Sequence, residues 1–184
     1  LDKMFYKNKK LRGLSQRDVP GISQGLIPSL VRNNVLGITH GINSGSATID
    51  VPPIFRWRLP GPTLQEVLYI RNKGGYPNPA GTSPNQPWGM GPDQCFKAPN
   101  TGHVLCFAFR NDNTGPPQSL AEVLHAYELM RARYTKAKIY GSSLEAFFEV
   151  LYQVKDQLPV VESELGDTWV QGAISDPKKV SQYR

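Results

Sequence analysis

The chain has 184 residues, 39% of them hydrophobic and 20% charged, a composition that is typical of a globular domain and excludes a disordered polymer. No apolar run is long enough to cross a bilayer, so no membrane span is expected. The net charge of +6 does not predict a nucleic-acid partner, because six basic residues and one acidic residue in the first 17 positions supply +5 of it and no nucleic-acid motif accompanies them.

A β-α-β unit is predicted near the start of the chain. Residues 14–18 have the pattern of a short strand, Ile22 to Arg32 that of a helix with apolar residues at helical spacing, and Val35 to His40 that of the next strand. Such a unit implies a parallel sheet with a right-handed crossover. Asp18 stands where the first strand is expected to end.

The middle of the chain lacks helical spacing. Val51 to Leu59 and Glu66 to Ile70 are predicted strands on either side of a turn at Pro60-Gly61-Pro62. Residues 72–102 contain six Gly and six Pro, which predicts a long irregular loop of a kind that is commonly functional. His103 to Phe109 has the pattern of a strand.

The two cysteines of the chain are Cys95 and Cys106. Cys106 falls in an apolar strand pattern, which favours a small core residue over a metal ligand or a nucleophile. A disulfide to Cys95 is the alternative, which two residues alone cannot establish.

Helical spacing resumes at Leu120, behind Ser119 as a candidate N-cap. The apolar residues expected on one face of this helix are Leu120, Val123, Leu124, Tyr127 and Met130. A short strand at Lys138 to Tyr140, a helix from Ser143 to Val154 and a strand from Val160 to Glu164 are predicted to follow. Leu144, Phe147, Phe148 and Leu151 should face inward from the second helix.

The order of these elements predicts an α/β fold. It fits part of a (β/α) barrel, with mainly parallel strands and the Gly/Pro-rich loop as an insertion, better than a sandwich or a helical bundle. The sequence starts at Leu1 without a start Met or a signal-peptide pattern and ends at Arg184 within an expected helix. We therefore expect residues 1–184 to be a fragment of one barrel domain of a longer protein.

Carboxylates follow three predicted strands, at Asp18, Asp112 and Asp167, with Glu164 close to the last. The carboxyl ends of barrel strands meet on one face, where two carboxylates suffice to cleave a glycosidic bond and an Asp can also bind a metal ion. Taken singly, each Asp is better explained as a helix cap or a turn residue than as a catalytic group. Trp169 could stack on a sugar ring, although core packing is the default explanation for a lone Trp.

Several motifs together resemble an uncharacterised family that is related to the glycoside hydrolase family 38 α-mannosidases. The segments that carry the resemblance are Leu14 to Gly25, Gly41 to Asn43, Val51 to Arg58, Asn111 to Pro117 and Glu164 to Lys178. It covers nearly the whole chain apart from the Gly/Pro-rich loop. Its most specific part is the Gly-Asp-Thr-Trp segment that ends at Trp169, with the Ser-Asp-Pro-Lys that follows it.

The resemblance implies a retaining glycosidase with a zinc ion in a (β/α)7 barrel and a carbohydrate substrate. Asp18, Gly21 and Ser23 match the mannosidase motif D-x-x-G-x-S, whose Asp is both nucleophile and zinc ligand. Asp112 would then be the acid, although a stricter register places Asn113 at that position. By the same resemblance Asp167 lines the sugar site, and we expect Glu164 and Trp169 to bind substrate beside it.

The chain also departs from the mannosidase pattern. Ile22 stands where the motif commonly carries His or an aromatic polar residue, and the other expected zinc ligands lie outside this sequence. Because zinc sites need three or four protein ligands, this chain alone should be inactive. The alternative is a non-catalytic carbohydrate-binding or interaction protein on the same fold, which Ile22 and Asn113 favour.

Overall fold

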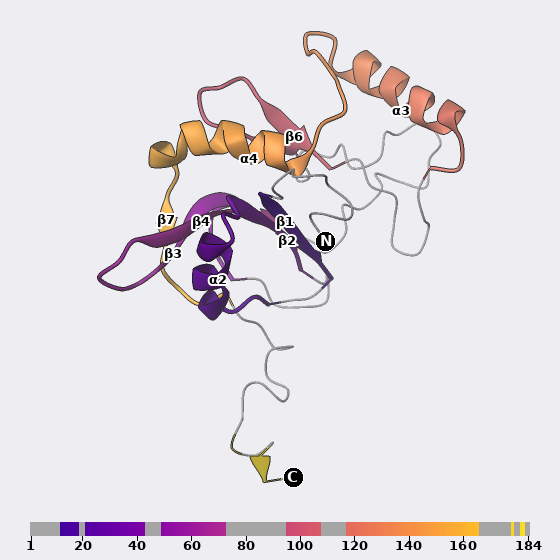
Figure 1. The fold of residues 1–184 in the computed structure, drawn as a ribbon. Helices are drawn as coiled ribbons and strands as arrows, with labels where there is room; N and C mark the ends of the chain where they lie inside the picture. The colour runs from indigo at the N-terminus through magenta and orange to yellow at the C-terminus, as the bar shows by residue number, and fades with distance from the viewer. Residues whose placement is uncertain are drawn as a thin grey trace.

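The computed structural model describes residues 12–18, 21–42, 49–72, 95–107 and 117–165, together with 178, 181 and 182. Within these ranges the elements form a mixed α/β fold (Figure 1). The strands are β1 (Gly13–Arg17), β2 (Gly37–Gly41), β3 (Ile54–Leu59), β4 (Gln65–Asn72), β5 (Cys95–Lys97), β6 (Val104–Cys106) and β7 (Val160–Val161). The helices are η1 (Gln24–Leu26), α2 (Ile27–Arg32), α3 (Leu120–Arg133), α4 (Leu144–Gln153) and η3 (Lys155–Gln157).

The predicted β-α-β unit is confirmed. β1 pairs in parallel with β2, and η1 and α2 form the connection between them. Ser23 caps η1 by accepting a hydrogen bond from the backbone N–H of Gly25 at 3.3 Å, and Pro28 lies in the first turn of α2, where its missing N–H has no helical partner to lose. β2 also pairs in parallel with β4.

The described sheet is not parallel throughout. Its strand order is β1-β2-β4-β3-β7, and β3 pairs with β4 in the antiparallel sense across the Pro60-Gly61-Pro62 turn. β7 runs parallel to β3. β3 and β7 therefore point the opposite way from β1, β2 and β4, so the carboxyl ends of the described strands lie at two opposite edges of the sheet.

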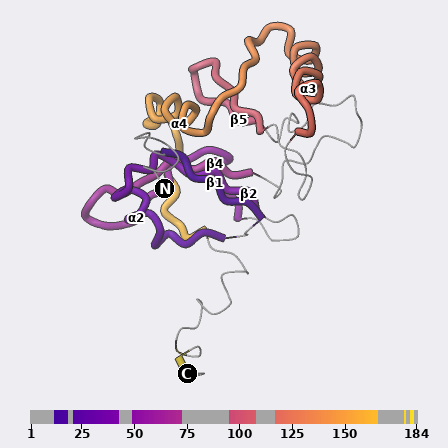
Figure 2. Tube along the Cα trace, turned by 45° about the vertical axis from the view of Figure 1, so that its right-hand side comes forward, coloured from indigo at the N-terminus to yellow at the C-terminus, as the bar shows by residue number. Residues whose placement is uncertain are grey.

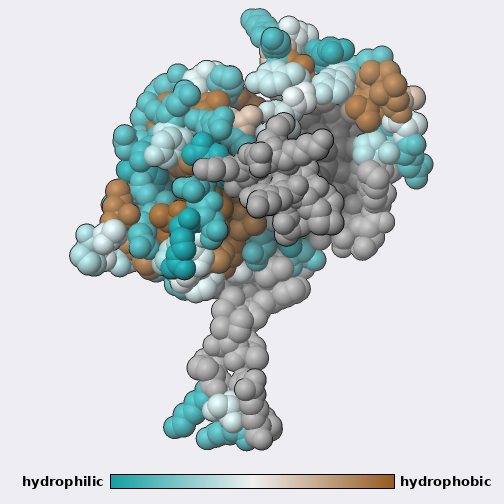
Figure 3. All heavy atoms as spheres, in the orientation of Figure 1, coloured by the Kyte–Doolittle hydropathy of each residue, from teal (hydrophilic) through white to brown (hydrophobic). Residues whose placement is uncertain are grey.

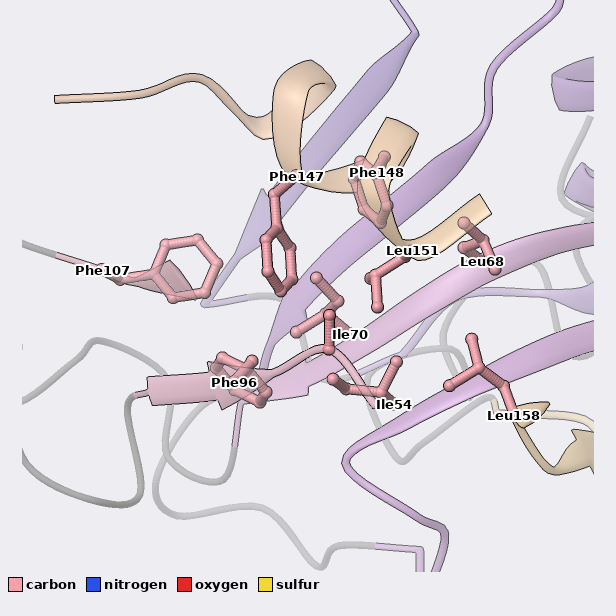
Figure 4. Packing of buried hydrophobic residues seen from close by; sticks show 10 residues of the cluster. Ile54, Leu68, Ile70, Phe96, Phe107, Phe147, Phe148, Leu151 and Leu158 are labelled. Atoms are coloured by element: carbon pink, nitrogen blue, oxygen red, sulfur yellow. The ribbon is translucent and has the colours of Figure 1, made fainter. Parts of the chain in front are cut away.

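Helices α4 and α2 lie on opposite faces of this sheet (Figures 1 and 2). A hydrophobic core lies on each face. On one face α4 packs Phe147, Phe148 and Leu151 onto β4 and β3, as the sequence predicts (Figure 4). Gly37 of β2 allows this close packing, because a Cβ atom there would lie 2.3 Å from Cε1 of Phe148. On the other face α2 covers a core that contains Trp57 and other aromatic and aliphatic side chains.

The predictions for α3 and the segment after it are partly wrong. The helix forms at the expected residues, with Ser119 as its N-cap, but its apolar side chains are not buried: Leu120 is 72% exposed and Leu124 is 53% exposed. Figure 3 shows hydrophobic surface over this helix. Helical spacing decides which residues share a face, but not whether another element covers that face. Residues 138–140 form no strand, since no neighbouring strand is paired with them.

A hairpin of β5 and β6 packs against the α4 side of the sheet. The described part of the predicted loop 72–102 thus includes β5, which pairs with β6. Cys95 and Cys106 are directly opposite each other in this ladder and form a disulfide, with their Cα atoms 4.2 Å apart. Of the two alternatives for Cys106, the structure therefore has the disulfide and not the unpaired core residue. Phe96 and Phe107 anchor the hairpin in the α4-side core (Figure 4).

Candidate functional site

The carboxyl ends of three parallel strands meet at one edge of the sheet. Arg17, Gly41 and Asn72 are the last residues of β1, β2 and β4, and they are partners in the strand register. We call this place the carboxyl edge and define it by Gln16, Arg17, Asp18, His40, Gly41, Arg71 and Asn72. Since side chains alternate along a strand, Gln16, His40 and Arg71 lie on the α2 face and Arg17 and Asn72 on the α4 face.

Asp18 directly follows β1 at this edge, as the sequence predicts. Its backbone N–H donates a hydrogen bond to the carbonyl oxygen of Gly41 at 2.8 Å, which fixes it beside the end of β2. Its φ of 60° lies in the left-handed region, which Asp tolerates better than most residues. Non-glycine residues with such a backbone are concentrated at functional sites, so the geometry makes Asp18 a candidate for one.

The α2 face of the carboxyl edge carries a buried pair of polar rings. Nδ1 of His40 is hydrogen-bonded to the hydroxyl group of Tyr69, and the Tyr69 ring stacks on Phe55 with centroids 4.8 Å apart. Burial raises the pKa of Tyr69 far above its ordinary value, while the positive charge of Arg71 acts in the opposite direction. Tyr69 is therefore a neutral phenol that positions the His40 imidazole.

Arg71 joins this edge to the segment before β3. Its Nη1 donates to the carbonyl oxygen of Val51 at 3.0 Å, and its backbone N–H donates to the carbonyl oxygen of Pro53 at 2.8 Å. The side chain is buried, so its charge acts in a region of low dielectric. The guanidinium group thus fixes the segment before β3 against the end of β4, and it places a buried positive charge at the carboxyl edge.

The α4 face of the edge has a different character. The Arg17 guanidinium carbon lies 4.9 Å from the centroid of the Phe107 ring, a cation–π contact. Asn72 is 5% exposed, and its Nδ2 has no hydrogen-bond partner in the described part of the chain. Two residues back along the strands, on the same face, the Thr39 hydroxyl group donates a hydrogen bond to that of Ser15 at 3.1 Å.

Glu164 lies away from the carboxyl edge, where it binds the backbone at the start of η1. It follows β7, which ends at the opposite edge of the sheet from β1, so the expectation that strand ends bring Glu164 and Asp18 together is not met. Its carboxylate accepts from the backbone N–H of Gln24 at 2.8 and 3.0 Å and from that of Leu165 at 2.9 Å. Glu164 is thus an acidic cap at the start of η1.

The other residues of the D-x-x-G-x-S match turn the chain from β1 into η1. The Gly21 carbonyl oxygen accepts from Nε2 of Gln16 at 3.3 Å, and the Ser23 hydroxyl group lies 3.4 Å from Oε2 of Glu164. Ile22 is buried in the α2-side core and forms a β-bridge with Leu165. Of the three residues that match the motif, Asp18 is therefore the one that lies at the carboxyl edge.

The remaining expected site residues lie outside the described residues: Asp112, its alternative Asn113, Asp167 and Trp169. Within the described ranges no three His, Cys, Asp or Glu side chains come together as a metal-binding group. Within those ranges Asp18 therefore does not belong to a group of three potential metal ligands. A search of the same ranges finds no helix long and apolar enough to span a membrane.

Sequence reasoning missed the contributions of Tyr69, Arg71 and Asn72. The predicted strand stopped at Ile70, whereas β4 continues to Asn72. A signal was present, because two polar residues directly after an apolar strand occupy the position where α/β folds place ligand-binding side chains.

The comparisons with known proteins identify no similar protein. No protein-family model matches this chain, and neither a curated protein nor a solved structure matches it.

Proposed function

We propose that this chain is part of a glycoside hydrolase-like protein that binds carbohydrate at the carboxyl edge, on a (β/α) barrel-type fold. One observation carries the proposal: Asp18, in a left-handed backbone conformation, is held by Gly41 at the carboxyl end of β1, beside the ends of β2 and β4. In α/β folds this is the end of the strands at which substrates bind. The motif match at Asp18 supports the same role.

In the proposed reaction Asp18 acts as the nucleophile of a retaining glycosidase. Its carboxylate oxygen forms a bond to the anomeric carbon while the bond from that carbon to the leaving oxygen breaks, and the leaving oxygen takes a proton from an acid. Asp112 is the proposed acid. Water then forms a bond to the anomeric carbon while the bond from that carbon to the Asp18 oxygen breaks, and the proton lost by the water goes to the carboxylate of the acid, so that both carboxyl groups return to their starting states. Zinc, which the resemblance implies as a cofactor, would need ligands besides Asp18.

A second candidate is a carbohydrate-binding protein without catalysis. The observation that favours it is the position of Ile22, which occupies the motif position of a polar or aromatic side chain yet is buried in the core and bridged to Leu165. In this alternative Asp18 accepts hydrogen bonds from sugar hydroxyl groups and forms no covalent bond.

The test uses the natural protein that contains this chain. Hydrolysis of an aryl α-mannoside is measured with and without added zinc, and binding of methyl α-mannoside by calorimetry, for the wild type, Asp18→Asn and Asp156→Asn. Asp156 is an exposed carboxylate in η3, so the last variant controls for loss of one charge. Turnover that is lost only in Asp18→Asn supports the hydrolase. Binding without turnover, weakened only in Asp18→Asn, supports the second candidate. Absence of both activities in the wild type overturns the proposal.

A further inference from the structure

The Cys95–Cys106 disulfide closes the end of the β5–β6 hairpin that lies farthest from its turn. The two cysteines are the outermost register pair of this ladder, and both residues are partly exposed. Access of a thiol to the sulfur atoms is a condition for thiol–disulfide exchange. The cross-link is therefore open to reduction in the folded protein.

The opposite end of the hairpin is held without the disulfide. The backbone N–H of Ala98 donates to the carbonyl oxygen of His103 at 2.9 Å, and the Thr101 hydroxyl group donates to the carbonyl oxygen of Ala98 at 3.1 Å. Nδ2 of Asn100 donates to Oε1 of Gln157 in η3 at 2.7 Å, which ties the turn to another element. Loss of the disulfide would therefore open the hairpin at the cysteine end and leave its turn in place.

The cysteine end of the hairpin leads directly to the carboxyl edge. Phe107 follows Cys106 in the chain, and its ring is buried in the α4-side core (Figure 4). The centroid of this ring lies 4.9 Å from the guanidinium carbon of Arg17. Arg17 ends β1 and precedes Asp18, whose backbone N–H is hydrogen-bonded to Gly41. The Phe107 ring thus connects the cross-link to the strand end that carries Asp18.

We propose that the Cys95–Cys106 disulfide is a redox-controlled clamp, which orders the carboxyl edge when it is oxidised and loosens the edge when it is reduced. The reductant is a dithiol. Its first thiolate forms a bond to one sulfur atom of the disulfide, and the other cysteine leaves as a thiolate that takes a proton. The second thiol of the reductant then displaces the first cysteine, so the protein gains two electrons and two protons and the dithiol becomes a disulfide. The clamp goes beyond the carbohydrate function and does not depend on it.

The expected effect follows from the size of the loop that the disulfide closes. A sequence separation of 11 corresponds to a shift of about 100-fold in the opening of the hairpin. Arg17 has interactions besides its contact with Phe107, so the effect on the carboxyl edge should be smaller than this. We expect reduction to speed the amide hydrogen exchange of residues 13–18 by about tenfold.

Hydrogen exchange followed by mass spectrometry tests the clamp in the natural protein that contains this chain. The samples are oxidised wild type, wild type reduced with dithiothreitol, and Cys95→Ser/Cys106→Ser with and without dithiothreitol. Residues 13–18 and 104–107 should exchange faster in reduced wild type, and equally fast in the double variant whether or not dithiothreitol is present. Residues 27–32 of α2, on the other face of the sheet, should be unaffected. Unchanged exchange of residues 13–18 after complete reduction overturns the proposal.

A second variant separates coupling through Phe107 from a general loss of stability. Phe107→Leu keeps the disulfide and an apolar side chain but removes the ring beside Arg17. Residues 13–18 of this oxidised variant should therefore exchange as fast as those of reduced wild type. Phe147→Leu makes the same replacement in the same core, from α4, and should keep the slow exchange of oxidised wild type. Equal exchange of residues 13–18 in the two leucine variants overturns the proposal.

Discussion

Removal of the Cys95–Cys106 disulfide should lower stability by an amount that the structure allows us to estimate. The cross-link joins register partners of β5 and β6, strands of three residues each, across a sequence separation of 11. A two-stranded hairpin of this length is marginally stable without further support. Phe96 and Phe107 supply part of that support by packing in the α4-side core.

The chain-entropy relation for a closed loop of this size gives about 2.7 kcal/mol, which is a change of about 100-fold in the equilibrium between open and closed hairpin. For a domain of this size that corresponds to a fall of about 5–10 °C in the thermal midpoint if the hairpin unfolds together with the sheet. The core contacts of the hairpin remain, so the double variant Cys95→Ser/Cys106→Ser should still fold.

The assay is thermal unfolding, followed by circular dichroism, of oxidised wild type, wild type reduced with excess dithiothreitol, and the double serine variant. Reduced wild type and the double variant should unfold at similar temperatures, both below the oxidised protein. Val104→Ser, an exposed position on the same hairpin, is the matched control and should have little effect. Equal midpoints for oxidised and reduced wild type, after a thiol assay has shown complete reduction, would refute the reasoning.

Three further predictions concern packing, capping and ionisation. Gly37→Ala places a Cβ atom 2.3 Å from the Phe148 ring and should cost about 1–3 kcal/mol in urea unfolding, whereas Gly25→Ala, with its nearest atom at 3.5 Å, serves as the tolerated control. Glu164→Ala should lower stability by about 1 kcal/mol through loss of the η1 cap and leave sugar affinity unchanged in calorimetry; a selective loss of affinity would return Glu164 to the substrate site. Because burial raises the pKa of Tyr69, the folded state holds the phenol proton more tightly than the unfolded state, so stability should fall as the pH rises above 10.0, the ordinary pKa of Tyr. Tyr69→Phe should remove that component of the alkaline loss, and an unchanged alkaline transition in this variant would contradict the assignment.

Local patterns in the sequence were sufficient where local contacts decide the structure. The spacing of apolar residues around Leu30 and Phe148 predicted α2 and α4 together with the faces that they bury. Asp18 was found because a carboxylate directly after a predicted strand is visible in the sequence.

Long-range pairing explains what the sequence did not show. The direction of β7 depends on its pairing with β3, about 100 residues earlier, and this pairing places Glu164 at the opposite edge from Asp18. No local sequence pattern indicates which strand β7 pairs with. Strand ends that have the same pattern in the sequence therefore lie at opposite edges of the sheet. Asn72 was missed for a related reason. Only the strand register, which aligns it with Gly41 and Arg17, shows that it lies at the carboxyl edge.

The contact between Gln24 and Glu164 has a consequence for how the chain reaches its native state during translation. The two residues are 140 positions apart, so at about 5–20 residues per second the ribosome needs roughly 7–28 s to deliver the carboxylate after the amide. During that interval the start of η1 lacks its acidic cap and β3 lacks β7. Completion of this layer is therefore a late event in biosynthesis, and a ribosome that stalls before residue 160 would leave one side of β3 open to pairing with another chain.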